Sequence, residues 1–429
     1  MSQSKQDIQK LGLHLMAKPV GPICNLECHY CFYLEKRELY PERQHFSMSD
    51  EVLRAYIEQN IRHEPSLEVL FTWQGGEPML RGLNFYRRAY AWQQELAGAK
   101  TIRNSIQTNG VLLDEEWCEF LAEAGFMVGI SLDGPQAIHD RDRVDKKERP
   151  TFDAVMKGLE LLKRFKIEFN VLVTVTSSVA EQPLAVYQFL KQQGVTHIQF
   201  NPVVERIPSN DDLALGLTFA TPPKLDENNL LRPTLMMTPH SVSPHAYGQF
   251  LIAIFDEWIR QDVGTIYVMN FEWALASWLQ LPSTICLFAK NCGNALIVEH
   301  NGDVYSCDHF MYPDYLLGNL QQSTPQQMAD SQQQRAFGQA KSTTLPDECR
   351  QCDYLFACHG ECPKNRFVIA RDGKPGLNYL CPSYKSYFQH LTPYLNAMAK
   401  LVSHNLPASM VMDALNGPLV IPLSDREVS

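Results

Sequence analysis

Residues 24–31 read Cys24-Asn25-Leu26-Glu27-Cys28-His29-Tyr30-Cys31, and the rest of the chain is organised around this stretch. Its three thiolates can hold three irons of a four-iron cube, which leaves the fourth iron open to a small molecule. A cluster that only carries electrons normally takes four cysteines, so the spacing predicts an iron that does chemistry. The alternatives are a structural zinc site or cysteines packed in the core. Zinc sites usually pair two C-x2-C units or include histidines, and one histidine offers no such pairing.

The composition is that of an ordinary globular protein. The chain has 429 residues, 45% of them hydrophobic and 20% charged, which allows about two to three domains. It contains no apolar run long enough to predict a transmembrane helix, and its polar N-terminus lacks the apolar core of a signal peptide. We therefore expect a cytoplasmic protein without a membrane partner. A net charge of −10 argues against nucleic acid as a partner.

The twelve cysteines are unevenly placed. Three lie in the opening stretch, Cys118 stands alone, and eight fall between Cys286 and Cys381. In a reducing compartment so many cysteines indicate metal binding rather than disulfides. The eight late cysteines can supply two complete four-thiolate clusters, or, as the alternative, a pair of zinc knuckles. Cys118 lies in a predicted helix and is expected to be a packed core cysteine.

Between residues 11 and 203 the pattern of strand and helix alternates six times. The strands are expected at residues 11–16, 67–73, 101–107, 126–132, 167–175 and 197–203. Such alternation predicts a parallel sheet with helical crossovers, and six units are too few for a closed eight-fold barrel. We expect an α/β fold with a partial, open-sided TIM-like barrel. Polar segments follow the strands and should gather at one rim, where ligands bind in such folds.

The remaining chain divides by composition. Residues 208–244 are rich in proline and asparagine and are expected to form an insertion or connector, whereas residues 246–261 predict an amphipathic helix. The stretch from Cys381 to about Met412 is expected to be helical, with a loose tail after it. The predicted units are a barrel at 10–245, connecting helices at 246–285, a cysteine-rich domain at 286–385, and a terminal helix and tail at 386–429.

The opening cysteines, followed one strand later by Gly75-Gly76-Glu77, resemble the radical S-adenosylmethionine (SAM) enzymes. The resemblance implies a partial (β/α)6 barrel, and S-adenosyl-L-methionine bound to the open iron through its amino and carboxylate groups. An electron from the cluster would then release a deoxyadenosyl radical. By the same resemblance Tyr30 meets the adenine, the Gly-Gly-Glu triplet binds the methionyl amino group, and Ser131, Arg143 and Val204 complete the pocket.

The spacing of the late cysteines resembles the SPASM extension of radical enzymes that modify peptides. From about residue 10 to 390 the chain is similar to the anaerobic sulfatase-maturating enzymes. The motifs that carry this similarity are Gln74-Gly75-Gly76-Glu77-Pro78, Gln107-Thr108-Asn109-Gly110, Ser131-Leu132-Asp133-Gly134-Pro135 and Tyr305-Ser306-Cys307-Asp308.

The resemblance implies three 4Fe-4S clusters and a grouping of their ligands. The first cluster takes Cys24, Cys28 and Cys31. One auxiliary cluster takes Cys286, Cys292, Cys307 and Cys362, and the other takes Cys349, Cys352, Cys358 and Cys381. Asp308, directly after a predicted ligand, has the role of a general base in the family, although an isolated aspartate is otherwise most often solvated.

The predicted function is post-translational oxidation of a cysteine or serine in an unfolded sulfatase segment to Cα-formylglycine, with a flavodoxin or ferredoxin as external electron donor. One alternative is another SPASM maturase, which forms a thioether or carbon–carbon crosslink and leaves no aldehyde. A non-enzymatic alternative is an iron-sulfur electron carrier or scaffold, which would not cleave S-adenosylmethionine. A zinc-binding interaction protein would contain zinc and no iron, whereas three cubes of four predict about twelve irons per chain.

Overall fold

The computed structural model describes residues 13–40, 45–224 and 236–416. The predictions for the polar leader, for the middle of the 208–244 connector and for the tail after residue 416 lie outside these residues. The first expected strand is described only from residue 13 onward, and it forms at His14–Ala17.

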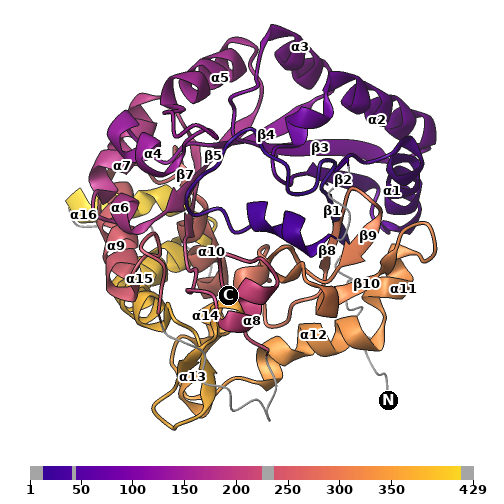
Figure 1. The fold of residues 1–429 in the computed structure, drawn as a ribbon. Helices are drawn as coiled ribbons and strands as arrows, with labels where there is room; N and C mark the ends of the chain where they lie inside the picture. Colours follow the sequence, from indigo (N-terminus) through magenta and orange to yellow (C-terminus); the bar gives the residue numbers. More distant parts are fainter. Residues whose placement is uncertain (1–12, 41–44, 225–235, 417–429) are drawn as a thin grey trace, which may run out of the picture.

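One curved sheet forms the centre of the molecule (Figure 1). Its ten strands run in the order β10-β9-β8-β1-β2-β3-β4-β5-β6-β7. Their bounds are β1 His14–Ala17, β2 Glu68–Trp73, β3 Thr101–Thr108, β4 Phe126–Ser131, β5 Phe169–Val175, β6 His197–Pro202, β7 Tyr267–Val268, β8 Ala295–Val298, β9 Asp303–Tyr305 and β10 Leu316–Asn319. Neighbours from β1 to β7 are parallel. The six predicted strands correspond to β1–β6, and the open-sided barrel is confirmed.

The cysteine-rich region joins the barrel through the same sheet. β8 pairs in parallel with β1, with His14 opposite Ala295, and β9 and β10 continue the sheet by antiparallel pairing. An unpaired edge of β1 would expose backbone donors and acceptors, and β8 satisfies them. The sheet therefore crosses the boundary expected at residue 286. A separate two-stranded sheet pairs β11 (Val368–Ile369) with β12 (Pro375–Leu377).

Helices cover the outside of the barrel, and the C-terminal region lies at its open side (Figure 1). The α-helices are α1 Asp50–His63, α2 Leu83–Leu96, α3 Glu115–Glu123, α4 Gln136–Asp142, α5 Phe152–Arg164, α6 Ser177–Ala180, α7 Pro183–Gln192, α8 Asn210–Ala214, α9 Pro244–Gln261, α10 Met269–Trp278, α11 Pro325–Ala329, α12 Gln332–Thr343, α13 Asp347–Arg350, α14 Leu355–Cys358, α15 Cys381–Ser403 and α16 Val411–Asn416. The 3-10 turns are η1 Leu34–Leu39, η2 Pro78–Arg81, η3 Cys286–Phe288, η4 Asp308–Phe310, η5 Pro313–Tyr315, η6 Pro363–Asn365 and η7 Ala408–Met410.

The long C-terminal helix ends earlier than expected. The sequence predicts helix to about Met412, but α15 stops at Ser403 and a short break precedes η7 and α16. Asn405 in this break has a left-handed backbone with φ of 58°, and Pro407 cannot donate to a helical hydrogen bond. These two residues turn the chain.

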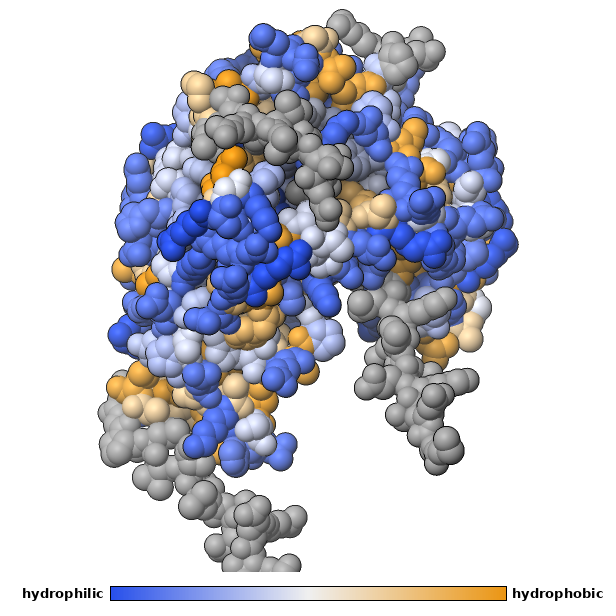
Figure 2. All heavy atoms as spheres, turned by 90° about the horizontal axis from the view of Figure 1, so that it is seen from below, coloured by the Kyte–Doolittle hydropathy of each residue, from blue (hydrophilic) through white to orange (hydrophobic). Residues whose placement is uncertain are grey.

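The sheet of the barrel is apolar and fully buried on one face. Trp73, Val128, Val171 and Val173 share this face, as expected where helices cover a parallel sheet. The opposite face carries partly buried polar residues, among them Gln107 and Asn170. On the face shown in Figure 2, hydrophilic residues predominate among the described residues and apolar ones form small separate groups. In the described part of the chain no helix is long and apolar enough to cross a membrane.

Candidate functional site

The opening cysteines lie in the loop that leaves β1. Backbone hydrogen bonds join this loop to the end of α4 and to the segment after it, because Glu27 N donates to Val144 O (2.9 Å) and His29 N to Asp142 O (3.0 Å). Burial raises the pKa of Cys24 and of Cys28 to about 12, and the neighbouring thiols add to the rise. Thiols that ionise with such difficulty become thiolates when they bind a metal, and three such donors in one loop fit a four-iron cluster with one iron left open.

The Gly75-Gly76-Glu77 triplet lies against the cysteine loop. Gly76 N donates to Gly21 O and Glu77 N to Ile23 O, each at 2.8 Å. The Glu77 carboxylate turns inward and accepts from Met79 N (3.0 Å), Thr108 Oγ1 (2.9 Å) and Asn109 N (2.8 Å). Burial raises its pKa to about 7. Glu77 is therefore a structural link, and within the triplet only the glycines are partly exposed.

A buried network connects the loop to β4 and β5. Tyr30 Oη donates to Asp133 Oδ2 (2.9 Å), and Arg143 Nε donates to the same oxygen (2.7 Å). Thr174 N donates to Oδ1 of Asp133 (2.7 Å), and the Arg143 guanidinium lies 5.5 Å from the Tyr30 ring centre. The structure thus brings together two predicted pocket residues, Tyr30 and Arg143. Asp133 was not predicted as a site residue, although an aspartate after a strand and before a glycine was a signal for it.

The other two predicted pocket residues lie at strand ends. Ser131 closes β4, where its hydroxyl accepts from Gln107 Nε2 (3.2 Å). Val204 follows β6 and is buried. Both stand at the carboxyl edge of the parallel sheet, the edge at which ligands bind in such folds. Their part in a ligand pocket stays a prediction.

The first predicted auxiliary set, group A, consists of Cys286, Cys292, Cys307 and Cys362. These thiols come from η3, from the loop before β8, from the residue before η4 and from the residue before η6. Burial raises the pKa of Cys307 well above its ordinary value, and the charges of Cys362, Cys286 and Cys292 raise it further. The structure therefore gathers these four thiols in one place, including Cys362 from beyond the next cysteine pair.

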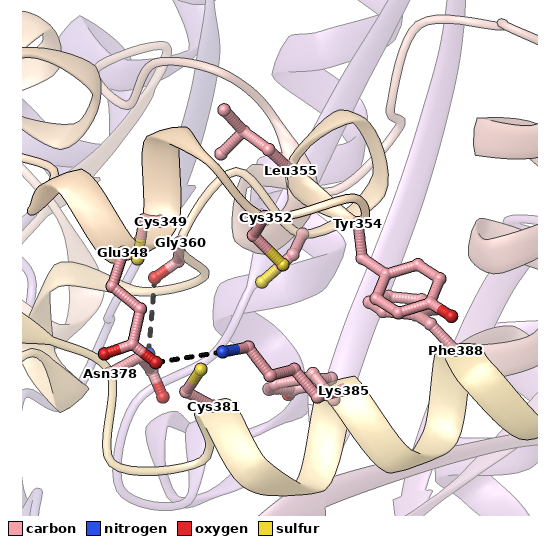
Figure 3. A pocket seen from close by; sticks show the side chains of 12 residues that line it. Glu348, Cys349, Cys352, Tyr354, Leu355, Gly360, Asn378, Cys381, Lys385 and Phe388 are labelled. Carbon is pink, nitrogen blue, oxygen red and sulfur yellow. Dashed lines mark hydrogen bonds and ion pairs between the residues drawn. The ribbon is translucent and has the colours of Figure 1, made fainter. Parts of the chain in front are cut away.

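The second predicted set, group B, lines a pocket with Cys349, Cys352, Cys358 and Cys381 (Figure 3). Tyr354 and Phe388 form an apolar wall, and Lys385 Nζ lies 3.0 Å from Glu348 Oε1 at its mouth. Figure 3 shows the sulfurs of Cys352 and Cys381 turned into the pocket. Burial raises the pKa of Cys358 to about 12, with contributions from Glu361 and then from Cys381 and Cys349. Four such donors fit a four-iron cluster. Cys118 lies apart, buried in α3, as predicted.

The predicted base, Asp308, begins η4 directly after Cys307 of group A. Oδ1 of Asp308 lies 2.6 Å from Nζ of Lys18, which follows β1. Lys18 is buried and its ammonium lies 3.9 Å from the Tyr33 ring centre. Burial by itself would raise the pKa of Asp308, but the charge and hydrogen bond of Lys18, together with His309 and Lys364, outweigh it and hold that pKa below its ordinary value. The sequence analysis missed Lys18, because a single lysine after a strand carries no pattern.

Comparisons with known proteins agree with this arrangement. Residues 19–190 match the radical SAM superfamily, and residues 286–353 match an iron-sulfur cluster-binding domain. The serine-type anaerobic sulfatase-maturating enzyme of Bacteroides thetaiotaomicron is 46% identical over 95% of this chain and 97% of its own length. The cysteine-type enzyme of Clostridium perfringens is 32% identical over 89% of this chain and 97% of its own. The solved structure of native anSMEcpe with bound AdoMet and Cp18Cys peptide superposes with a TM-score of 0.77 at 31% identity, covering 91% of this chain and 99% of that one.

Proposed function

Because this chain belongs to the family of anaerobic sulfatase-maturating enzymes, we propose that it oxidises a cysteine or serine of a sulfatase peptide to Cα-formylglycine. The observation that carries the proposal is the position of Asp308, a carboxylate adjoining the thiols of group A and paired with Lys18. Asp308 can receive the proton that the substrate loses. A cluster held by group A, next to Asp308, can receive the electron.

When bound, the clusters and S-adenosylmethionine supply the radical that removes a hydrogen from the substrate Cβ, and an acceptor for the second electron. Tyr30 and Arg143, joined through Asp133, hold the nucleoside. The backbone of Gly75 and Gly76 meets the methionyl amino group. Group A and group B hold the auxiliary clusters, and Cys24, Cys28 and Cys31 hold the first one.

Asp308 takes the proton of the substrate thiol or hydroxyl. Lys18 keeps the carboxylate ionised before the proton arrives, since a general base must be deprotonated and in contact with the proton that it removes. The substrate therefore loses one hydrogen atom from Cβ, one proton to Asp308 and one electron. Serine gives the aldehyde directly, whereas cysteine gives a thioaldehyde that water converts to the aldehyde.

The partners follow from this chemistry. The substrate is an unfolded segment with the motif Cys/Ser-x-Pro-x-Arg, and the electron donor is a flavodoxin or ferredoxin. The solved relative with bound Cp18Cys peptide supports a peptide substrate. We place the reaction in the cytoplasm, where free thiols persist.

Mass spectrometry tests the proposal. Reconstituted enzyme is incubated anaerobically with S-adenosylmethionine, a reductant and either a cysteine or a serine version of the motif peptide, and the product is treated with an aldehyde-reactive hydroxylamine. We expect an aldehyde adduct on at least one peptide. The variant Asp308→Asn should still cleave S-adenosylmethionine but form no adduct. Loss of two hydrogens without an adduct would instead indicate a crosslinking maturase, and an unchanged peptide would rule out this substrate.

A further inference from the structure

Two imidazoles and one carboxylate from distant parts of the chain meet beside the first cysteine loop. One ligand atom from each of His29, Asp142 and His240 lies within 4.8 Å of the other two. Oδ1 of Asp142 is 2.9 Å from Nδ1 of His240 and 3.7 Å from Nδ1 of His29. A metal about 2.0–2.1 Å from its ligands sets neighbouring ligand atoms about 3.0 Å apart at right angles and about 3.4 Å apart at the tetrahedral angle. The Asp142–His240 separation of 2.9 Å already matches this spacing, and the 3.7 Å between Asp142 and His29 exceeds it by only a few tenths of an ångström, so a small side-chain shift is enough to place one ion among the three groups.

Outer contacts orient two of the three groups. Nε2 of His29 pairs with Oε2 of Glu148 at 2.9 Å, which leaves Nδ1 on the side of Asp142. Oδ2 of Asp142 accepts from the hydroxyls of Thr176 (3.0 Å) and Ser178 (3.2 Å), which leaves Oδ1 toward the imidazoles. A metal-binding histidine almost always gives its other nitrogen to a carboxylate, carbonyl or water. The His29–Glu148 pair has this form.

We propose that His29, Asp142 and His240 form a binding site for one divalent transition-metal ion of the zinc type, separate from the three cysteine groups. Two histidines and one carboxylate are a ligand set that such ions take. The two imidazole side chains are each 32% exposed and Asp142 is 6% exposed, so water can complete the coordination from the solvent side. The ion replaces the hydrogen bond that joins Asp142 to His240 in its absence.

The ion would fasten three segments together. His29 lies in the cysteine loop, Asp142 ends α4 just before Arg143, and His240 lies in the connector that precedes α9. Ser177 N donates to His240 O (3.0 Å), so the connector already rests on α6. The bound ion therefore holds the loop that carries Cys28 against α4 and the connector. The proposal does not depend on the proposed function.

Zinc binding to the holoenzyme tests the site. Enzyme with its cysteine groups filled is stripped of loosely held metal and titrated anaerobically with Zn²⁺. We expect the wild type to bind one additional ion, and His240→Gln to bind it at least tenfold more weakly. His245→Gln is the matched control, since His245 is exposed in the same part of the chain, and it should bind as the wild type does. X-ray absorption at the zinc edge should show nitrogen and oxygen neighbours at about 2.0–2.1 Å.

A second variant tests the same site in case His240→Gln fails to fold. The Glu148 side chain is 70% exposed, so Glu148→Gln should keep the full iron content and still weaken Zn²⁺ binding about tenfold, as loss of an outer partner does. Equal binding by the wild type, His240→Gln and Glu148→Gln would overturn the proposal. So would a wild type that binds no zinc, or a zinc ion with sulfur neighbours at about 2.3 Å, which would mean that it occupies cysteines.

Discussion

Nδ1 of His309 lies 3.4 Å from Sγ of Cys362, so the residue after the predicted base touches a predicted ligand of group A. The Phe32 ring packs edge-on against the imidazole with a centroid distance of 5.6 Å, which fixes the ring. A thiolate bound to iron has no proton to give, so this contact is a hydrogen bond when Nδ1 of His309 carries the proton. Hydrogen bonds to cluster sulfurs raise a cluster's reduction potential.

Replacing His309 should therefore lower one auxiliary midpoint potential. A hydrogen bond worth about 1 kcal/mol corresponds to roughly 40 mV for a one-electron couple, and we expect a shift of about this size in His309→Phe. Redox titration followed by electron paramagnetic resonance measures it. His309→Gln, which keeps an N–H donor, should recover part of the shift. Identical potentials in all three proteins would show that the contact does not tune the cluster.

Lys18 should be needed for proton removal and not for radical formation. In Lys18→Met the carboxylate of Asp308 loses its positive partner, so a larger share of Asp308 is protonated at neutral pH. We expect formylglycine formation to fall by about tenfold or more, the scale of general-base effects, while 5′-deoxyadenosine still forms. Lys147→Met, at the exposed turn after α4, serves as the control. A variant that makes both products at the wild-type ratio would contradict the assignment of Lys18.

Gly76 should tolerate no side chain. A Cβ atom at this position would lie 2.0 Å from Ile23 O and 2.4 Å from Ile23 C, which are backbone atoms of the cysteine loop. Gly76→Ala should push the loop away and lower both the iron content and S-adenosylmethionine binding. Gly194→Ala has open space around its new Cβ and carries only the backbone strain of a positive φ, about 1–2 kcal/mol. If both variants bind S-adenosylmethionine equally, the loop is not held by this contact.

Iron content should separate the clustered cysteines from the isolated one. Removing Cys358 from group B leaves three thiols, so Cys358→Ala should lose about four of about twelve irons per chain. Cys118→Ala removes a thiol that lies within the apolar core and should keep all of them. Iron analysis of anaerobically reconstituted protein provides the counts. A full iron complement in Cys358→Ala would mean that group B does not need this ligand.

His139 should make the fold sensitive to acid. It is buried, and its Nδ1 accepts from Asp133 N (3.3 Å), which requires a neutral ring. Burial lowers its pKa from 6.5 to about 4 in the folded protein. Between these values the unfolded chain binds more protons, so stability rises with pH there and is lost as pH falls from about 6.5 to about 4. The full effect approaches about 3 kcal/mol.

Thermal unfolding at a series of pH values measures this dependence. The wild-type melting temperature should fall more steeply between pH 6.5 and pH 5 than that of His139→Asn, which lacks the titrating ring. The carboxylates and clusters are the same in both proteins, so their contribution to the pH dependence of the melting temperature cancels in the comparison. Parallel curves for the two proteins would show that His139 does not contribute to acid sensitivity.

Local spacing was enough to predict the architecture. The three cysteines of residues 24–31, the six strands and the Gly75–Gly76 turn are patterns within short windows, and each forms at the expected place. Helix α4 was missed because its seven residues are too few to show a clear period. The grouping of Cys362 with Cys307 came only from the family resemblance, since linear order would place Cys362 with its nearer neighbours, Cys352 and Cys358.

The sequence by itself determined the metal-binding chemistry and the alternation of strands and helices, because cysteine spacing and hydrophobic periodicity act over a few residues. Only the tertiary structure decided what surrounds that chemistry. Pairing of β8 with β1 brings residues from the two ends of the chain into one sheet, and this pairing places Lys18 against Asp308 beside Cys307. Backbone pairing between distant strands leaves no trace in local sequence. The opening cysteines therefore predicted an iron site. The sheet placed the proton acceptor Asp308 beside Lys18, which follows the first strand.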